Sequence, residues 1–155
     1  MVSRESIKIN FTYAYFNGLN VFAGDIIKAY LQAPSSKKDF MICGPYFGLE
    51  NIYKVALIPR ALYGGNSAGS DFRNHMRSCM RHLDFESCPS DPDVWMRPVK
   101  KSDGSKYYEY VLLYTDDVLC ISENAEYILR DIGKYFELNP GSVGPPKYIP
   151  WWTCP

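Results

Sequence analysis

The chain of 155 residues lacks the features that mark several classes of protein. It contains no apolar run near the ~20 residues that a membrane-spanning helix needs, and no N-terminal secretion signal. It also lacks an excess of charge of either sign, because 17 Lys and Arg residues balance 17 Asp and Glu residues. The global charge therefore gives no sign of a nucleic-acid partner, although a local basic patch remains compatible with one. We expect an intracellular protein without a membrane partner.

The five cysteines of this chain are widely spaced. The cysteines form no Cys-x-x-Cys pair and no zinc-finger spacing, and their number is odd: Cys43, Cys79, Cys88, Cys120 and Cys154. His75 and His82 lie seven residues apart, and together with the cysteines they match no metal-site spacing. The sequence predicts buried or half-buried thiols in a reducing compartment rather than a disulfide framework.

Internal repeats and low-complexity tracts are also absent, and a hydrophobic content of 46% suits one globular domain. Apolar periodicity and turn residues predict helices at 5–17, 68–84 and 123–138, and strands at 19–25, 40–43, 52–58, 91–96, 107–115 and 118–121. A basic loop is expected at 34–38 and a hairpin turn at 100–105. Because this order has hairpins rather than regular βαβ units, it predicts an α+β fold in which helices pack on one face of an antiparallel sheet.

Two adjacent carboxylates interrupt the most apolar part of the chain. Asp116 and Asp117 follow the strand predicted at 107–115 and precede the apolar residues 118–121. A charge beside a core is costly unless it is paired or bound to a cation. Asp is also common in turns, so turn chemistry alone would explain the pair, and on this pattern alone it is the favoured interpretation.

Asp25 has the same character, because it ends a predicted strand and precedes Ile26 and Ile27. If the two strands were adjacent in one sheet, Asp25 and Asp116 would converge. Carboxylate oxygens suit Mg²⁺, which one or two carboxylates and substrate phosphates typically hold. Two such ions, about 3.5–4 Å apart, clamp the attacking and leaving oxygens in a phosphoryl transfer. The three carboxylates therefore raise a two-metal site as a hypothesis.

Four segments, in order, resemble motifs of the copia-type retrotransposon reverse transcriptases. Residues 114–117 (Tyr-Thr-Asp-Asp) are similar to the Tyr-x-Asp-Asp motif, and residues 25–31 to the upstream Asp-x-x-x-Ala-Phe/Tyr-Leu motif. Residues 60–64 resemble the Ala-Leu-Tyr-Gly signature of this class, and residues 91–95 its Asp-Pro-x-x-Phe/Trp segment. The resemblance extends over residues 5–148 and has its motifs in the family's order.

The resemblance implies a polymerase palm, with a ferredoxin-like or RRM-like sheet, and an RNA-directed DNA polymerase activity. Asp25, Asp116 and Asp117 would be the catalytic carboxylates, and they would bind two Mg²⁺ or Mn²⁺ ions. The primer 3′-OH would attack the α-phosphate of a deoxynucleotide, as in other two-metal nucleotidyl transfers.

The resemblance also implies a nucleotide site formed by Ile26, Ile27, Lys28, Ala29, Tyr30, Tyr63 and Gly64. In that site the backbone of residues 26–29 would lie under the triphosphate. The ring of Tyr30 would exclude a ribose 2′-OH, and Tyr63 and Gly64 would border the templating base pair. Tyr114 and Thr115 would contact nucleic acid.

The chain departs from the family at residues 65–69, which read Gly-Asn-Ser-Ala-Gly where Leu-Lys-Gln-Ala-Pro is common. We expect residues 1–148 to be a reverse transcriptase palm with a remnant of the fingers, and residues 149–155 to be a divergent C-terminal tail. The rest of a retrotransposon polyprotein would then be a partner.

Arg73, Arg77 and Arg81 lie four residues apart, and so form a line along one flank of the predicted helix 68–84. This line would suit contacts to nucleic-acid phosphates. A solvated helix flank would show the same pattern, so both interpretations stay open.

Three functions fit the sequence. The first is a reverse transcriptase that uses deoxynucleotides and a primed RNA or DNA template, in the cytoplasm or in virus-like particles. The second is a catalytically silent remnant of a retroelement that still folds. The third is a module that binds nucleic acid with the face of its sheet, as RNA-recognition domains do.

Overall fold

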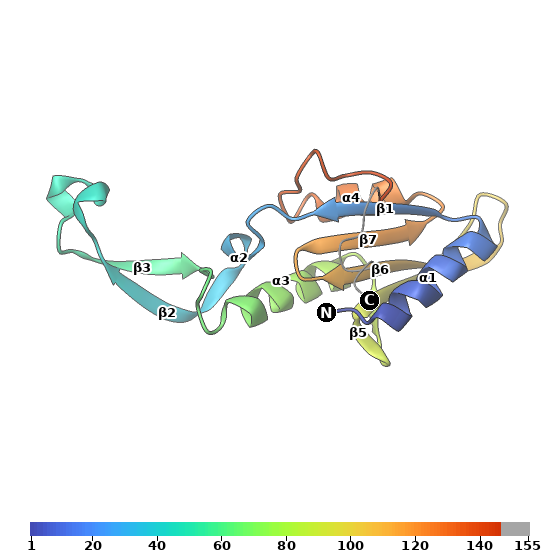
Figure 1. The fold of residues 1–155 in the computed structure, drawn as a ribbon, viewed down its shortest axis with the longest axis horizontal. Helices are drawn as coiled ribbons and strands as arrows, with labels where there is room; N and C mark the ends of the chain where they lie inside the picture. Colours follow the sequence, from blue (N-terminus) through green and yellow to red (C-terminus); the bar gives the residue numbers. More distant parts are fainter. Residues whose placement is uncertain (147–155) are drawn as a thin grey trace. The chain divides into compact units, whose positions relative to one another are not determined.

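The computed structural model describes residues 1–146 of the chain (Figure 1). These residues form an α+β fold with an antiparallel sheet of five strands and a separate sheet of two strands. The chain divides into two compact units, which we call the sheet unit (residues 1–27 and 79 onward) and the hairpin unit (residues 28–78). The predicted fold class, α+β with an antiparallel sheet, is therefore confirmed. The tail predicted at 149–155 lies outside the described residues.

The sheet unit contains α1 (Arg4–Asn17), β1 (Asn20–Asp25), β4 (Glu86–Cys88), β5 (Asp91–Lys100), β6 (Lys106–Tyr114), β7 (Asp117–Ser122) and α4 (Ala125–Ile132). The hairpin unit contains α2 (Ala29–Gln32), β2 (Pro34–Ile42), two 3-10 turns (Pro45–Phe47 and Leu49–Asn51) and β3 (Val55–Arg60). α3 (Ala68–His82) begins in the hairpin unit and ends in the sheet unit. The strand order of the larger sheet is β1-β7-β6-β5-β4, and every neighbouring pair is antiparallel.

α1 has clear start and stop signals in the sequence. The hydroxyl of Ser3 accepts a hydrogen bond from the N–H of Ser6 (3.1 Å) at the N-cap. At the other end Gly18 adopts a left-handed conformation with φ of 60°, which glycine allows at little cost. Between these caps Ile7 and Ala14 are buried in one apolar cluster with sheet residues that include Leu119.

The helices cover both faces of the five-stranded sheet. Leu119 of β7 lies in the apolar cluster of α1, so the side chain of its strand neighbour Val118 lies on the opposite face. Gly24 is the cross-strand partner of Val118, and a Cβ atom placed on Gly24 would lie 3.1 Å from Leu129 of α4. α4 therefore packs on the face opposite α1. The expectation that the helices share one face was wrong, because β7 has apolar side chains on both faces and each needs cover.

Several predicted boundaries shift in the structure. The third helix was expected to reach residue 138 but ends at Ile132, where the N–H of Gly133 caps the carbonyl of Leu129. The segment 34–38 was expected to be a loop, yet it forms the first half of β2. α2 and β4 were not predicted, since each is only a few residues long. None of the helices in residues 1–146 is long and apolar enough to cross a membrane.

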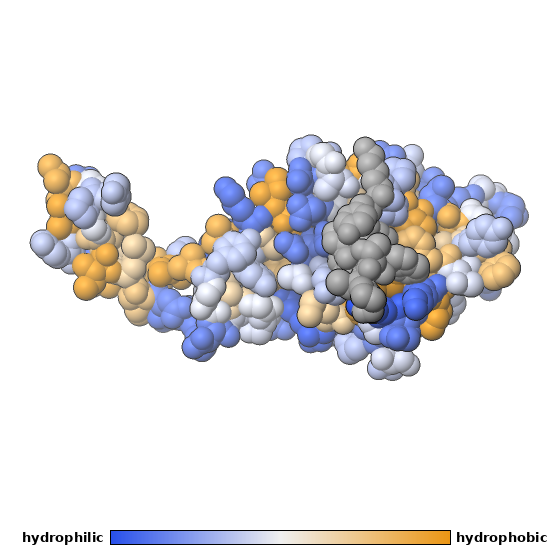
Figure 2. All heavy atoms as spheres, viewed as in Figure 1, coloured by the Kyte–Doolittle hydropathy of each residue, from blue (hydrophilic) through white to orange (hydrophobic). Residues whose placement is uncertain are grey.

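The two strands of the hairpin unit expose an apolar face. Phe40 pairs with Leu57, and Ile42 pairs with Val55, so all four side chains project from one face of the two-stranded sheet. Each of the four is more than half exposed. Hydrophobic side chains are visible on the surface of the β2–β3 hairpin in Figure 2. The hairpin unit thus has little core of its own.

The cysteines of the described chain behave as the sequence predicts. Cys43, Cys79, Cys88 and Cys120 are free thiols, and all but the half-buried Cys88 are buried. Burial raises the pKa of Cys79 to about 12, so its thiol stays protonated at neutral pH.

Candidate acidic site at the ends of β1, β6 and β7

The register of the sheet brings together two carboxylates that lie 92 positions apart in the printed sequence. Asp25, the last residue of β1, is the direct cross-strand partner of Asp117, the first residue of β7. On the other side of β7, Tyr114 is also the partner of Asp117. Because direct partners project to the same face of a sheet, these three side chains lie on the face that α1 covers.

Asp116 lies in the two-residue turn that joins β6 to β7. Its carbonyl oxygen accepts a hydrogen bond from the N–H of Ile26 (2.9 Å). The backbones of Asp116 and Asp25 are therefore held next to each other, as the sequence predicts for adjacent strands. The direct partner of Asp25 is Asp117, however, because Asp116 belongs to the turn and not to the strand.

The carboxylates form a pair of opposed like charges rather than a complete ligand cage. Within residues 1–146, no three His, Cys, Asp or Glu side chains lie close enough together to hold a metal ion. Two opposed carboxylates nevertheless fit Mg²⁺, which is typically held by one or two carboxylates together with substrate phosphates. Like charges directly opposite in a sheet are destabilising, and a divalent cation between them would remove that cost. All three Asp side chains are partly exposed, so the site is open to solvent.

The turn beside this pair is strained. Thr115 has φ of 56°, in the left-handed region that β-branched residues rarely adopt. Asp116 has no positive φ, so the turn has the pattern that usually takes glycine at its first central position. A conformation of this kind costs about 1–3 kcal/mol and persists where the surroundings impose it, frequently at functional sites.

The residues expected to bind the nucleotide fall into both units. In the sheet unit the N–H of Ile27 donates to the carbonyl of Glu137 (3.0 Å), and Ile26 is bonded to Asp116. In the hairpin unit Lys28, with φ of 47°, precedes the buried Ala29. The N–H groups of residues 26 and 27 are thus already used within the sheet unit.

Tyr30 and Tyr63 form an aromatic cluster within the hairpin unit. Their ring centroids lie 4.9 Å apart, and the ring of Phe72 lies 5.9 Å from that of Tyr30. Tyr63 is exposed, and the next residue, Gly64, has φ of 84°. The structure therefore brings together Tyr30 and Tyr63, two of the residues that the resemblance assigns to the nucleotide site.

The predicted arginine line runs along α3 across the boundary between the units. Arg73 and Arg77 belong to the hairpin unit, and Arg81 belongs to the sheet unit. Arg73 and Arg81 are exposed, whereas Arg77 is half-buried. This exposure fits phosphate contacts and a solvated helix flank equally, so the role of these side chains stays a prediction.

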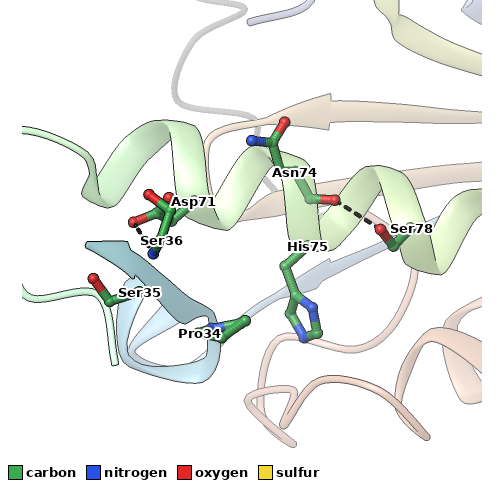
Figure 3. Close-up of a pocket in the computed structure, with 7 residues that line it drawn as sticks. All are labelled: Pro34, Ser35, Ser36, Asp71, Asn74, His75 and Ser78. Carbon is green, nitrogen blue, oxygen red and sulfur yellow. Dashed lines mark hydrogen bonds between the residues drawn. The ribbon is translucent and has the colours of Figure 1, made fainter. Parts of the chain in front are cut away.

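The hairpin unit contains a polar pocket of about 280 Å³ that the sequence did not predict (Figure 3). It is lined by Pro34, Ser35, Ser36, Asp71, Asn74, His75 and Ser78. The buried Asp71 carboxylate accepts a hydrogen bond from the N–H of Ser36 (3.2 Å), and the Ser78 hydroxyl donates to the Asn74 carbonyl (3.1 Å). The first of these bonds connects β2 to α3, and the second lies within α3. In the sequence, the only sign of this contact is that Asp71 lies in the first turn of the helix.

Hydrogen bonds and burial around this pocket shift two pKa values. Hydrogen bonds from the Ser36 side chain and backbone, and from the Ser67 hydroxyl, hold the pKa of Asp71 below its ordinary value of 3.8 although burial opposes them. Burial and, secondarily, the charge of Arg60 lower the pKa of His75 below its ordinary 6.5. At neutral pH Asp71 is therefore charged and His75 is neutral.

The two units carry opposite net charges. Residues 28–78 contain seven Lys and Arg residues and three Asp and Glu residues, whereas the rest of the chain contains ten and fourteen. The balanced total therefore hides a basic hairpin unit and an acidic sheet unit. The hairpin unit also exposes several aromatic side chains: Phe40, Tyr46, Phe47, Tyr53 and Tyr63.

Comparisons of this chain with protein-family models, with curated proteins and with solved structures find no match.

Proposed function

We propose that this chain is the palm region of a copia-type reverse transcriptase, an RNA-directed DNA polymerase with a palm-like, ferredoxin-like sheet. The observation that carries the proposal is the direct pairing of Asp25 with Asp117 beside the turn that contains Asp116. The two motifs that resemble the family contribute these residues, and nothing in their spacing along the chain requires them to meet. Their pairing is what a shared cation site would need.

The chain's own residues would position the reacting groups. Asp25, Asp116 and Asp117 would hold two Mg²⁺ or Mn²⁺ ions, and Tyr30 with Tyr63 would line the sugar and base pocket. The ions, when bound, would activate the primer 3′-OH and stabilise the charge on the departing pyrophosphate. The strand ends would keep the carboxylates oriented. Positioning and charge stabilisation of this kind account for most of the rate enhancement in phosphoryl transfer.

The partners follow from the same proposal. Deoxynucleotides and a primed RNA or DNA template would be the substrates, and the remainder of a retrotransposon polyprotein would be the protein partner. The basic, aromatic hairpin unit supports a nucleic-acid partner, because single strands bind to basic grooves with aromatic stacking surfaces. The cytoplasm or virus-like particles would be the place of action.

A silent remnant is the second candidate, since no three-ligand group is assembled within residues 1–146. A module that binds nucleic acid on an open sheet face is disfavoured. Helices α1 and α4 cover the two faces of the five-stranded sheet.

Primer extension on an RNA template, with Mg²⁺ or Mn²⁺, tests the proposal. We expect metal-dependent incorporation, and a loss of at least about 100-fold with Asp25→Asn or Asp116→Asn, because several kcal/mol of charge stabilisation disappear. Asp131→Asn is the matched control, since Asp131 lies in α4 and pairs with Lys134 at 2.7 Å. Equal incorporation by Asp116→Asn and wild type would reject the polymerase. A cooperative melt without incorporation by wild type would identify the silent remnant.

A further inference from the structure

The outer edge of β1 is closed by the segment that follows α4. We call residues 137–144 the return segment. Ala23 and Gly144 exchange two backbone hydrogen bonds (2.7 and 3.1 Å), and Ile26 pairs with Leu138. The N–H of Ile27 donates to the carbonyl of Glu137 (3.0 Å). β1 is therefore held between β7 on one side and the return segment on the other.

Asp25 is bonded to the return segment through both of its backbone polar groups. Its carbonyl accepts a hydrogen bond from the N–H of Asn139 (2.8 Å). Its N–H donates to the side-chain hydroxyl of Ser142 (2.8 Å), whereas Ala23 and Ile27 donate to backbone carbonyls. One side-chain oxygen thus completes the edge at the residue that faces Asp117.

The Ser142 hydroxyl is not needed to close the turn in which it lies. The N–H of Ser142 already donates to the carbonyl of Asn139 (2.9 Å), and the hydroxyl donates to that same oxygen (2.8 Å). The second bond fixes the orientation of the hydroxyl, so that a lone pair faces the N–H of Asp25. The contribution that only this side chain makes is therefore the acceptor for Asp25.

We propose that Ser142 is a positioning residue for Asp25, an inference that rests on the cation site proposed above. Asp25 lies at the end of β1, directly opposite Asp117, so the position of this strand end sets where its carboxylate lies relative to that of Asp117. Ser142 and Asn139 hold the backbone of Asp25 in place, and so fix the point from which its carboxylate would reach a cation shared with Asp117. Without the hydroxyl the N–H of Asp25 loses its partner, and the strand end adjusts.

Mn²⁺ titration and amide hydrogen exchange of the full chain test this role. Ser142→Ala is expected to weaken Mn²⁺ binding about tenfold and to speed exchange at the Asp25 amide by a similar factor. Ser142→Thr keeps the hydroxyl and should stay within about twofold of wild type. Ser142→Cys has nearly the same volume but is a weak acceptor, so it should fall between the two. It also serves as the test if the Ala variant fails to fold.

Ser87→Ala is the matched control, because it also removes one hydroxyl that donates to a backbone carbonyl (3.0 Å to Pro92) in the sheet unit. It should leave Mn²⁺ affinity unchanged. If Ser142→Ala lowers the melting temperature but leaves Mn²⁺ affinity at the wild-type value, Ser142 is only structural and the inference is wrong. If wild-type protein binds no Mn²⁺, or if Asp25→Asn does not reduce binding, the proposed cation site itself fails and the positioning role fails with it.

Discussion

The sheet unit and the hairpin unit distribute apolar and charged side chains in opposite ways. The sheet unit buries the apolar residues of β7 on both faces and carries an excess of acidic residues. The hairpin unit exposes four paired apolar side chains of β2 and β3 and carries an excess of basic residues. The acidic site therefore lies on the unit with the larger apolar core, and the exposed apolar and basic side chains gather on the unit that has little core of its own.

The largest expected difference between the units is in stability. Leu119→Ala in β7 should lower the free energy of unfolding by about 2–5 kcal/mol, because Leu119 is 2% exposed and its loss leaves a cavity. Leu57→Ala in β3 makes the same chemical change at a side chain that is 52% exposed, and should stay within about 0.5 kcal/mol. Urea unfolding of the two variants measures the contrast. Equal losses would mean that the hairpin face is covered in solution.

The next contrast is in nucleic-acid binding. Replacing both Lys37 and Lys38 of the hairpin unit by Ala should weaken binding of a primed RNA–DNA duplex about tenfold near 0.1 M salt. The dependence of log K on log salt should fall by about 1.5, since each lost phosphate contact removes about 0.7–0.9 from the slope. Fluorescence anisotropy across a salt series measures both quantities.

Lys100 and Lys106 give the matched control for that experiment, because they are cross-strand partners in the sheet unit. Their replacement by Ala removes the same charge and should change affinity less than twofold. A similar loss from both double variants would show that binding follows total charge and that the hairpin unit has no special role.

A smaller effect is expected at the strained turn of the sheet unit. Thr115→Asn should raise the free energy of unfolding by about 0.5–1 kcal/mol, because Asn tolerates a positive φ better than a β-branched residue. Thr12→Asn, on the exposed side of α1, is the control, since Thr and Asn have similar helix propensity. If Thr115 serves the proposed activity, primer extension should fall while stability rises. No gain in stability would show that the turn carries no strain.

Local sequence signals predicted the elements with strong periodicity and failed where long-range pairing decides. α1, α3, β6 and β7 were predicted within a few residues because their apolar spacing and caps are local. The first half of β2 has no such pattern. The composition of residues 34–38 is typical of a loop, and their extended structure depends on contacts with β3 and α3. α4 was predicted too long because apolar residues continue past Gly133.

The candidate site also contains residues that local sequence signals revealed and residues that they did not. The Tyr-Thr-Asp-Asp segment and Asp25 were visible as carboxylates among apolar residues, whereas the adjacency of β1 and β7 was only a hypothesis, which the register of the sheet confirms. The exact partner of Asp25 depends on which residues form the two-residue turn. Ser142 had no local signal at all, because its bond to Asp25 spans 117 residues. Side chains that support a site from a distant segment are set by tertiary packing.

The smallest expected effect is the acid dependence of the stability that Asp71 gives the hairpin unit. The pKa of Asp71 is lower in the folded chain than the 3.8 of an ordinary Asp, so its contribution to stability is present above that value and is lost as the pH falls through the folded pKa. Asp71→Asn should therefore melt lower than wild type at pH 6, and the difference should shrink as the pH falls below the ordinary value of 3.8. Melting temperatures across this range measure the effect.

Asp39→Asn is the control, because Asp39 is exposed on β2, and it should give the wild-type curve. If the melting temperatures of Asp71→Asn and wild type differ by the same amount at every pH, the charge of Asp71 is not what stabilises the contact between β2 and α3.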